Sequence, residues 1–114
     1  SYMPPKLQDK DVEEAWILLM NQKLDLIEAK CISHGGITGT ANDIRIILKE
    51  ALLRNATAIA LCHNHPSGNP RPSREDDNIT NSLKKAADTM HIYFVDHVIV
   101  AQQHFYSYRE EGRI

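Results

Sequence analysis

The sequence has no long hydrophobic run and very little cysteine. Its apolar stretches fall well short of the roughly 20 residues that a transmembrane helix needs, so no membrane segment is expected. No signal-peptide pattern is found either. The two cysteines, Cys31 and Cys62, lie in apolar, strand-like surroundings typical of buried thiols. This usage excludes a disulfide framework and favours a reduced, cytoplasmic protein.

Neither positive nor negative charge is in large excess. The chain has 13 Lys and Arg against 15 Asp and Glu, a formal net charge of -2, and its cations are scattered rather than clustered. Because nucleic-acid binding generally requires a basic patch, no direct nucleic-acid binding is predicted for this domain. The sequence also lacks the Gly-Lys-Ser/Thr phosphate loop, the His-Glu-x-x-His motif and the zinc-deaminase pattern.

What the sequence does have is the length and composition of one globular domain. Its 114 residues suit a single core, and 42% hydrophobic with 25% charged residues is ordinary for a soluble fold. Residues 1–11 are polar and contain Pro4-Pro5, so they are predicted to form an arm or linker before a domain at 12–114. The chain does not start with Met, and further domains are expected upstream.

The hydrophobic pattern predicts an α/β (α+β) fold, with a mixed sheet flanked by helices. Apolar residues at i, i+3, i+4, i+7 and i+8 mark a first helix capped by Asn42 or Asp43 and ended by a left-handed Asn55. The stripe consists of Ile44, Ile47, Leu48, Ala51 and Leu52. Strands are predicted near 15–20, 26–33, 57–62, 92–101 and 105–108, with a second helix starting near Ser73.

The chemistry is concentrated between Cys62 and Asp76. Side chains alternate along a strand, so His63 and His65 point the same way while Cys62 points away as a buried thiol. A Gly/Pro-rich loop then leads to Ser73-x-x-Asp76, which brings a carboxylate on the next helix. Two imidazoles and a carboxylate leave a fourth position for water, which is the pattern of a catalytic zinc site.

Each of these signals also has a structural explanation. Ser73-x-x-Asp76 matches a helix capping box, a role that does not exclude metal chemistry. A hydrolytic site also needs a proton acceptor, and Glu13 and Glu14 are the candidates. Spacing alone does not choose between these two glutamates, which could equally be solvated. The pair Asp96-His97 in the long strand either supports the site or is a buried polar pair.

The combined motif resembles a known family. His63-x-His65-Pro66, then six intervening residues and Ser73-x-x-Asp76, is similar to the signature of the JAMM (MPN-plus, JAB) metalloproteases. The longer string from His63 to Ser73 resembles the bacterial RadC proteins, which are labelled DNA repair proteins. The similarity runs from about residue 12 to the end, and includes Lys49-Glu50-Ala51-Leu52 with Ala56, Asp96-His97-Val98-Ile99-Val100, and Tyr106-Ser107-Tyr108.

The resemblance implies a JAB/MPN-like, cytidine-deaminase-like fold and one Zn²⁺ per chain held by His63, His65 and Asp76. It implies that Glu14, which has the register Glu-x-x-x-apolar-apolar, is the catalytic base, and that Ser73 helps to bind the oxyanion. The implied reaction is hydrolysis of an amide or isopeptide bond. Relatives also carry an upstream helix-hairpin-helix domain, which is expected before residue 1.

The prediction is therefore a zinc metallopeptidase domain acting on an unidentified protein or peptide. The main alternative is a DNA-repair-associated or protein-interaction module with a structural or vestigial metal site. A metal-dependent nuclease is disfavoured because the balance of charge is acidic and no second carboxylate cluster is present for two metals. The oligomeric state is left open, although an exposed edge in residues 92–108 could pair two chains into a homo-oligomer.

Overall fold

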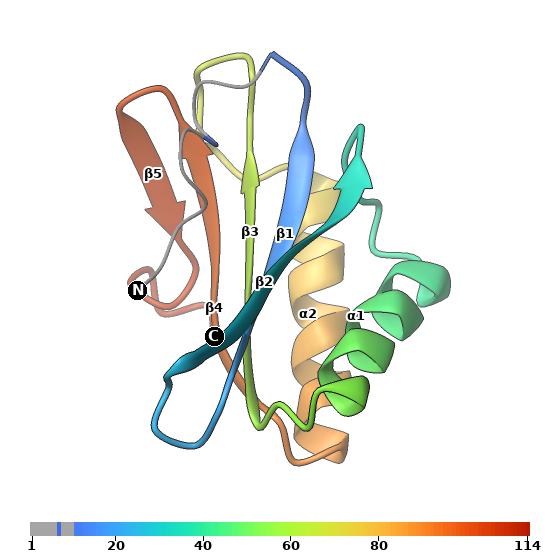
Figure 1. Cartoon of the computed structure of the whole chain (residues 1–114). Coiled ribbons are helices and arrows are strands. Elements are labelled where there is room, and N and C mark those ends of the chain that lie inside the picture. Colours follow the sequence, from blue (N-terminus) through green and yellow to red (C-terminus); the bar gives the residue numbers. More distant parts are fainter. Residues whose placement is uncertain (1–6, 8–10) are drawn as a thin grey trace.

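The computed structural model describes residue 7 and residues 11–114, so most of the predicted arm at 1–11 lies outside the described residues. The order of strands and helices is the predicted one (Figure 1). The elements are β1 (Glu14–Met20), β2 (Leu26–His34), α1 (Ala41–Leu53), β3 (Ala58–Asn64), α2 (Arg74–Thr89), β4 (Tyr93–Ala101) and β5 (His104–Ser107).

The five strands form one mixed sheet in the order β2-β1-β3-β4-β5. Only the pair β3–β4 is parallel, and α2 is the crossover that joins these two strands. The central strand β3 is buried along its whole length. It also runs further than predicted, because His63 pairs with Ala15 of β1 on one side and with Ile99 of β4 on the other. His63 therefore belongs to the strand and not to the following loop, which corrects the expected end at residue 62.

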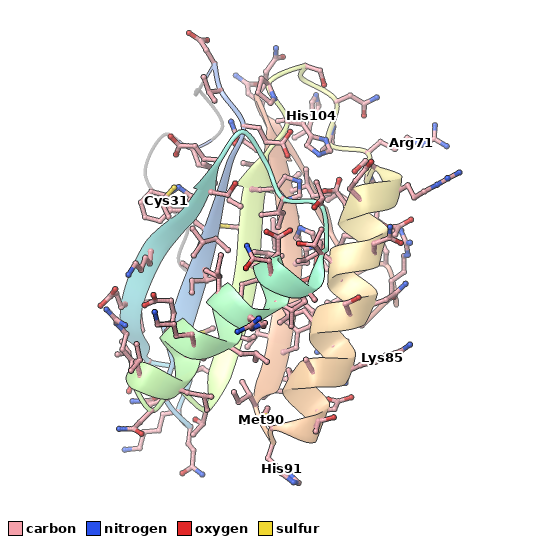
Figure 2. All side chains as sticks on the ribbon, turned by 90° about the vertical axis from the view of Figure 1, so that its right-hand side faces the viewer. Cys31, Arg71, Lys85, Met90, His91 and His104 are labelled. Atoms are coloured by element: carbon pink, nitrogen blue, oxygen red, sulfur yellow. The ribbon has the colours of Figure 1, made fainter. Side chains whose placement is uncertain are left out.

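Both helices cover the same face of the sheet, as Figure 1 and the perpendicular view in Figure 2 show. The main core lies between them and the sheet, with apolar side chains of β1 and β3 packed against those of α1 and α2. Alternation along the strands produces this face, since every second residue points to the helices. Its largest fully buried members include Ile17, Leu19, Ile47, Ile59, Leu61, Ile79 and Leu83.

Helix α1 differs from its prediction at its start and on one side. Thr40 is the N-cap, and Asp43 is its capping-box partner three residues later, so neither Asn42 nor Asp43 is the cap. Leu52 was expected in the buried stripe but is 51% exposed, because the sheet contacts a narrower face centred on Ile47 and Ala51. The left-handed Asn55, with φ of 53°, is confirmed. Neither helix in the described part of the chain is long and apolar enough to cross a membrane.

Candidate metal centre

The predicted metal ligands come together where β3 ends and α2 begins. His63 is the penultimate residue of β3 and His65 follows the strand, and their Nε2 atoms lie 3.1 Å apart. Asp76, in the first turn of α2, places Oδ1 3.0 Å from the Nε2 of His63 and Oδ2 3.1 Å from the Nε2 of His65. The β-α-β connection explains the meeting, because it returns the start of α2 to the carboxyl end of β3.

These three side chains fit a zinc ion. Tetrahedral coordination with Zn–N and Zn–O bonds near 2.0–2.1 Å places neighbouring ligand atoms about 3.3 Å apart, so the observed separations need only a small outward shift. Among the described residues, two overlapping groups have ligand atoms within 4.8 Å of one another. They are Glu13 with His63 and His65, and His63 with Asp76 and His97.

Asp76 caps its helix and also faces the histidines. Ser73 is the N-cap of α2: its Oγ accepts the Asp76 N–H at 3.1 Å, and its own N–H donates to Asp76 Oδ2 at 2.8 Å. The capping box is therefore present, and the carboxylate still contacts both imidazoles. Burial alone would raise the pKa of Asp76, but the facing nitrogens of His63 and His65 and the Ser73 N–H hold it well below its ordinary value.

The loop between β3 and α2 sets the orientation of His65. Its Nδ1 lies 3.0 Å from the carbonyl oxygen of Asn69, and the N–H of Gly68 returns to the carbonyl of His65. Gly68 has a φ of 90°, a conformation that favours glycine. Contact with Asp76 raises the pKa of His65, and partial burial opposes this. A proton on Nδ1, donated to Asn69, leaves Nε2 free to bind a metal.

His63 is supported from behind by His97 on β4. The Nε2 of His97 lies 2.9 Å from the Nδ1 of His63, and its Nδ1 lies 2.6 Å from the Oγ1 of Thr80. Burial holds the pKa of His97 well below its ordinary value. Asp96 points elsewhere, to Ser107 and to the Arg109 N–H, so only His97 of the predicted pair supports the site. Thr80 is not among the predicted site residues, although it lies one helical turn after Asp76.

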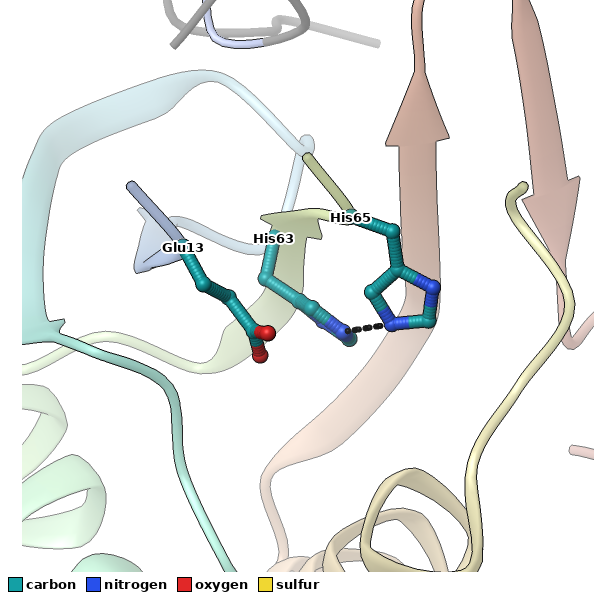
Figure 3. A group of neighbouring side chains, drawn as sticks. All are labelled: Glu13, His63 and His65. Atoms are coloured by element: carbon teal, nitrogen blue, oxygen red, sulfur yellow. Dashed lines mark hydrogen bonds between the residues drawn. The ribbon is translucent and has the colours of Figure 1, made fainter. Parts of the chain in front are cut away.

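The two adjacent glutamates lie on opposite faces of the sheet, and the structure places Glu13 at the site. Ala15 pairs with His63, so Glu13 shares the face of the histidines, and Figure 3 shows its carboxylate beside them. Glu14 faces the other way, where its Oε1 accepts the Trp16 Nε1–H at 3.1 Å. Glu13, and not the expected Glu14, therefore has its carboxylate beside the histidines, because a shift of one residue exchanges the two faces of a strand.

Gly36 makes room for the Glu13 side chain. A Cβ atom at residue 36 would lie 2.7 Å from Glu13 Oε2, and the φ of 93° also favours glycine there. The neighbouring Gly35 N–H donates to the carbonyl oxygen of Glu13. An open cleft of about 450 Å³ separates this loop from the histidine loop, and it is lined by Glu13, residues 35–38, His65, Pro66, Ser67, Ser73, Glu75 and Asp76.

Cys62 is buried on the opposite face from His63, as predicted, whereas Cys31 is only partly buried. Burial raises the pKa of Cys62 to about 12, so only about one molecule in ten thousand carries the reactive thiolate at pH 8.

We expect iodoacetamide at pH 8 to modify Cys31 in the folded protein and Cys62 only after denaturation, as measured by mass spectrometry of the two peptides. Equal rates at both sites in the folded protein would contradict this placement.

A mixed sheet presents two histidines at a strand end to an aspartate at the start of the next helix. This geometry is the one expected for a JAB-type domain. Comparison with known proteins agrees. The chain belongs to the RadC-like JAB domain family, whose sequence model matches residues 1–113.

Curated relatives share this similarity along nearly the whole chain. Three of them are named UPF0758 proteins and come from Flavobacterium johnsoniae (38% identical, covering 96% of this chain and 48% of the relative), Symbiobacterium thermophilum (38%, covering 97% and 47%) and Streptococcus gordonii (40%, covering 96% and 48%). The chain thus spans about half the length of the curated relatives that it matches.

Proposed function

We propose that this domain is a zinc-dependent hydrolase that cleaves an amide or isopeptide bond in a protein or peptide. The observation that supports this best is the convergence of His63, His65 and Asp76, whose facing atoms lie 3.0–3.1 Å apart, with the Glu13 carboxylate beside them. Three protein ligands would leave a fourth zinc position for water or substrate. In this proposal the substrate binds in the cleft in front of this group.

Glu13 is the proton carrier in this proposal. When bound, a zinc ion polarises a carbonyl group and lowers the pKa of its water to about 7. The Glu13 carboxylate takes the proton from the attacking water and returns it to the leaving nitrogen. The backbone around Gly35 and Gly36 holds this carboxylate at the edge of the cleft. Glu14 was predicted for this role, but its carboxylate bonds to Trp16 on the far side of the strand.

Ser73 has a second role in the proposal, as a donor to the developing oxyanion. As an N-cap, its Oγ uses a lone pair to accept the Asp76 N–H. A hydroxyl group also has one proton to donate, so capping leaves that proton available to a substrate oxygen. Ser73 lines the cleft beside His65 and Asp76, which supports this role.

Zinc content is the first test of this function. Protein from zinc-replete cells, purified in metal-free buffers, is expected to carry about one equivalent of zinc by elemental analysis, since the ligand set is that of a mononuclear site. His65→Ala, which removes a partly exposed ligand, should lower the content strongly while the fold persists. Less than about half an equivalent in the unmodified protein would contradict the proposal and favour a protein-interaction module with a vestigial site.

A further inference from the structure

A line of hydrogen bonds runs from the backbone of α2 to the Nδ1 atom of His63. The Thr80 hydroxyl donates to the Asp76 carbonyl oxygen at 2.8 Å, and its oxygen lies 2.6 Å from His97 Nδ1. His97 Nε2 then lies 2.9 Å from His63 Nδ1. All three side chains in the line are at most 2% exposed, so their protons are shared within the protein.

The protons in this line can be assigned one after another. A hydroxyl group has a single proton, so if Thr80 donates it to the carbonyl oxygen of Asp76, its oxygen accepts from His97 Nδ1. In this arrangement His97 carries its proton on Nδ1. A neutral ring with its proton on Nδ1 has a bare Nε2, which accepts a hydrogen bond. The partner at that acceptor is Nδ1 of His63, which must then carry the proton of that ring.

We propose that Thr80 and His97 are positioning residues that hold the His63 proton on Nδ1 and so present a bare Nε2 to the metal. The inference rests on the proposed function, because it takes that Nε2 as a zinc ligand. The line also ties two ligands together, since it starts at the backbone of Asp76 and ends at His63. A metal-binding histidine needs such a partner to fix its tautomer and ring orientation.

The ring of His97 is itself held in place by Tyr108. The two rings are stacked, with centroids 4.9 Å apart and planes inclined by 10°. The Tyr108 hydroxyl donates to Asp77 Oδ1 at 2.7 Å, which anchors the stacked ring to α2. Helix α2 therefore supports His97 both through Thr80 at its ring edge and through Tyr108 at its ring face.

Nuclear magnetic resonance of the protein labelled with ¹⁵N in its histidine rings reads the tautomers directly, with and without zinc. We expect His97 to carry its proton on Nδ1 and to have a bare Nε2 in both states. A His97 proton on Nε2 would overturn the inference, because Nε2 could then not accept from His63. This measurement requires neither a substrate nor catalytic activity.

Zinc affinity tests the consequence, measured by competition with a chromophoric chelator. Thr80→Val removes the hydroxyl at nearly constant shape and is expected to weaken zinc binding about 10-fold or more, whereas Thr80→Ser keeps the hydroxyl and should stay within about threefold. His97→Gln, whose amide can both accept from His63 and donate to Thr80, should likewise bind more tightly than His97→Leu. Equal affinities within each pair would overturn the inference.

These measurements separate the inference from the proposed function. Thermal unfolding of the metal-free variants shows whether each pair is equally folded. If the unmodified protein binds no zinc at all, the proposed function fails, and the His97 tautomer alone then decides whether the hydrogen-bond line holds His63 as inferred.

Discussion

Glu13→Gln is expected to abolish hydrolysis while leaving zinc affinity nearly unchanged. The substitution keeps the shape of the side chain beside His63 and His65 but removes the proton acceptor, and the loss of a general base typically costs about 10²–10⁴ in rate. Because the substrate is not known, the measurement compares new protein N-termini in a cell lysate treated with zinc-loaded unmodified protein or with the variant. Cleavages that disappear with Glu13→Gln would be the activity of this site.

Glu14→Gln is the matched control, one residue further along the same strand. Its carboxylate contacts Trp16 on the far face of the sheet, so the cleavage pattern should persist. Loss of cleavage in Glu14→Gln with survival in Glu13→Gln would restore the assignment that the family resemblance implied. It would also require β1 to shift by one residue relative to β3, because the present register pairs Ala15 with His63.

Asp76→Ala should weaken zinc binding far more than the loss of a helix cap alone would. The substitution removes a carboxylate that faces both histidines and, at the same time, the capping-box partner of Ser73. Loss of a capping interaction costs about 1 kcal/mol, whereas loss of one of three ligands should exceed the 10- to 100-fold that a supporting residue contributes to metal affinity. Chelator competition measures the affinity, and chemical denaturation of the metal-free protein measures the cap.

Asp43→Ala provides the control, because α1 has the same capping box as α2. Thr40 and Asp43 repeat the arrangement of Ser73 and Asp76 away from the metal centre. Both alanine variants should lose free energy of unfolding without metal, and only Asp76→Ala should also lose zinc. Equal zinc affinity in both variants would make Asp76 a helix cap and nothing more.

The sequence predicted the order of strands and helices because their local signals are strong. Alternating apolar residues, the helical stripe around Ile47 and the serine before α2 depend on neighbours within a few positions. Leu52 was misplaced because its exposure depends on how wide a face of α1 the sheet contacts, which no local pattern specifies. The last residues of β3 were missed for a similar reason, since they are held as strand by pairing with β1 and β4.

At the site, the convergence of three side chains could be predicted and their surroundings could not. His63, His65 and Asp76 lie within one strand-loop-helix segment, so their meeting follows from local geometry. The choice between Glu13 and Glu14 depends instead on the register between β1 and β3, which residues some fifty positions apart establish. The metal ligation, the catalytic roles and the oxyanion role of Ser73 stay predictions that the experiments above test.

The position of His63 in the middle strand would link metal binding to the stability of the domain. A ligand on a flexible loop can swing away while the rest of the chain stays folded. His63 is paired on both sides and fully buried, so it cannot move without separating β3 from β1 and β4. A zinc ion would bind this folded arrangement and not the unfolded chain, so saturating zinc at about 1,000 times its Kd would stabilise the whole domain by about 4 kcal/mol. Amide hydrogen exchange in β3 would slow accordingly on zinc binding, and the lifetime of the folded domain in a cell would follow the supply of metal.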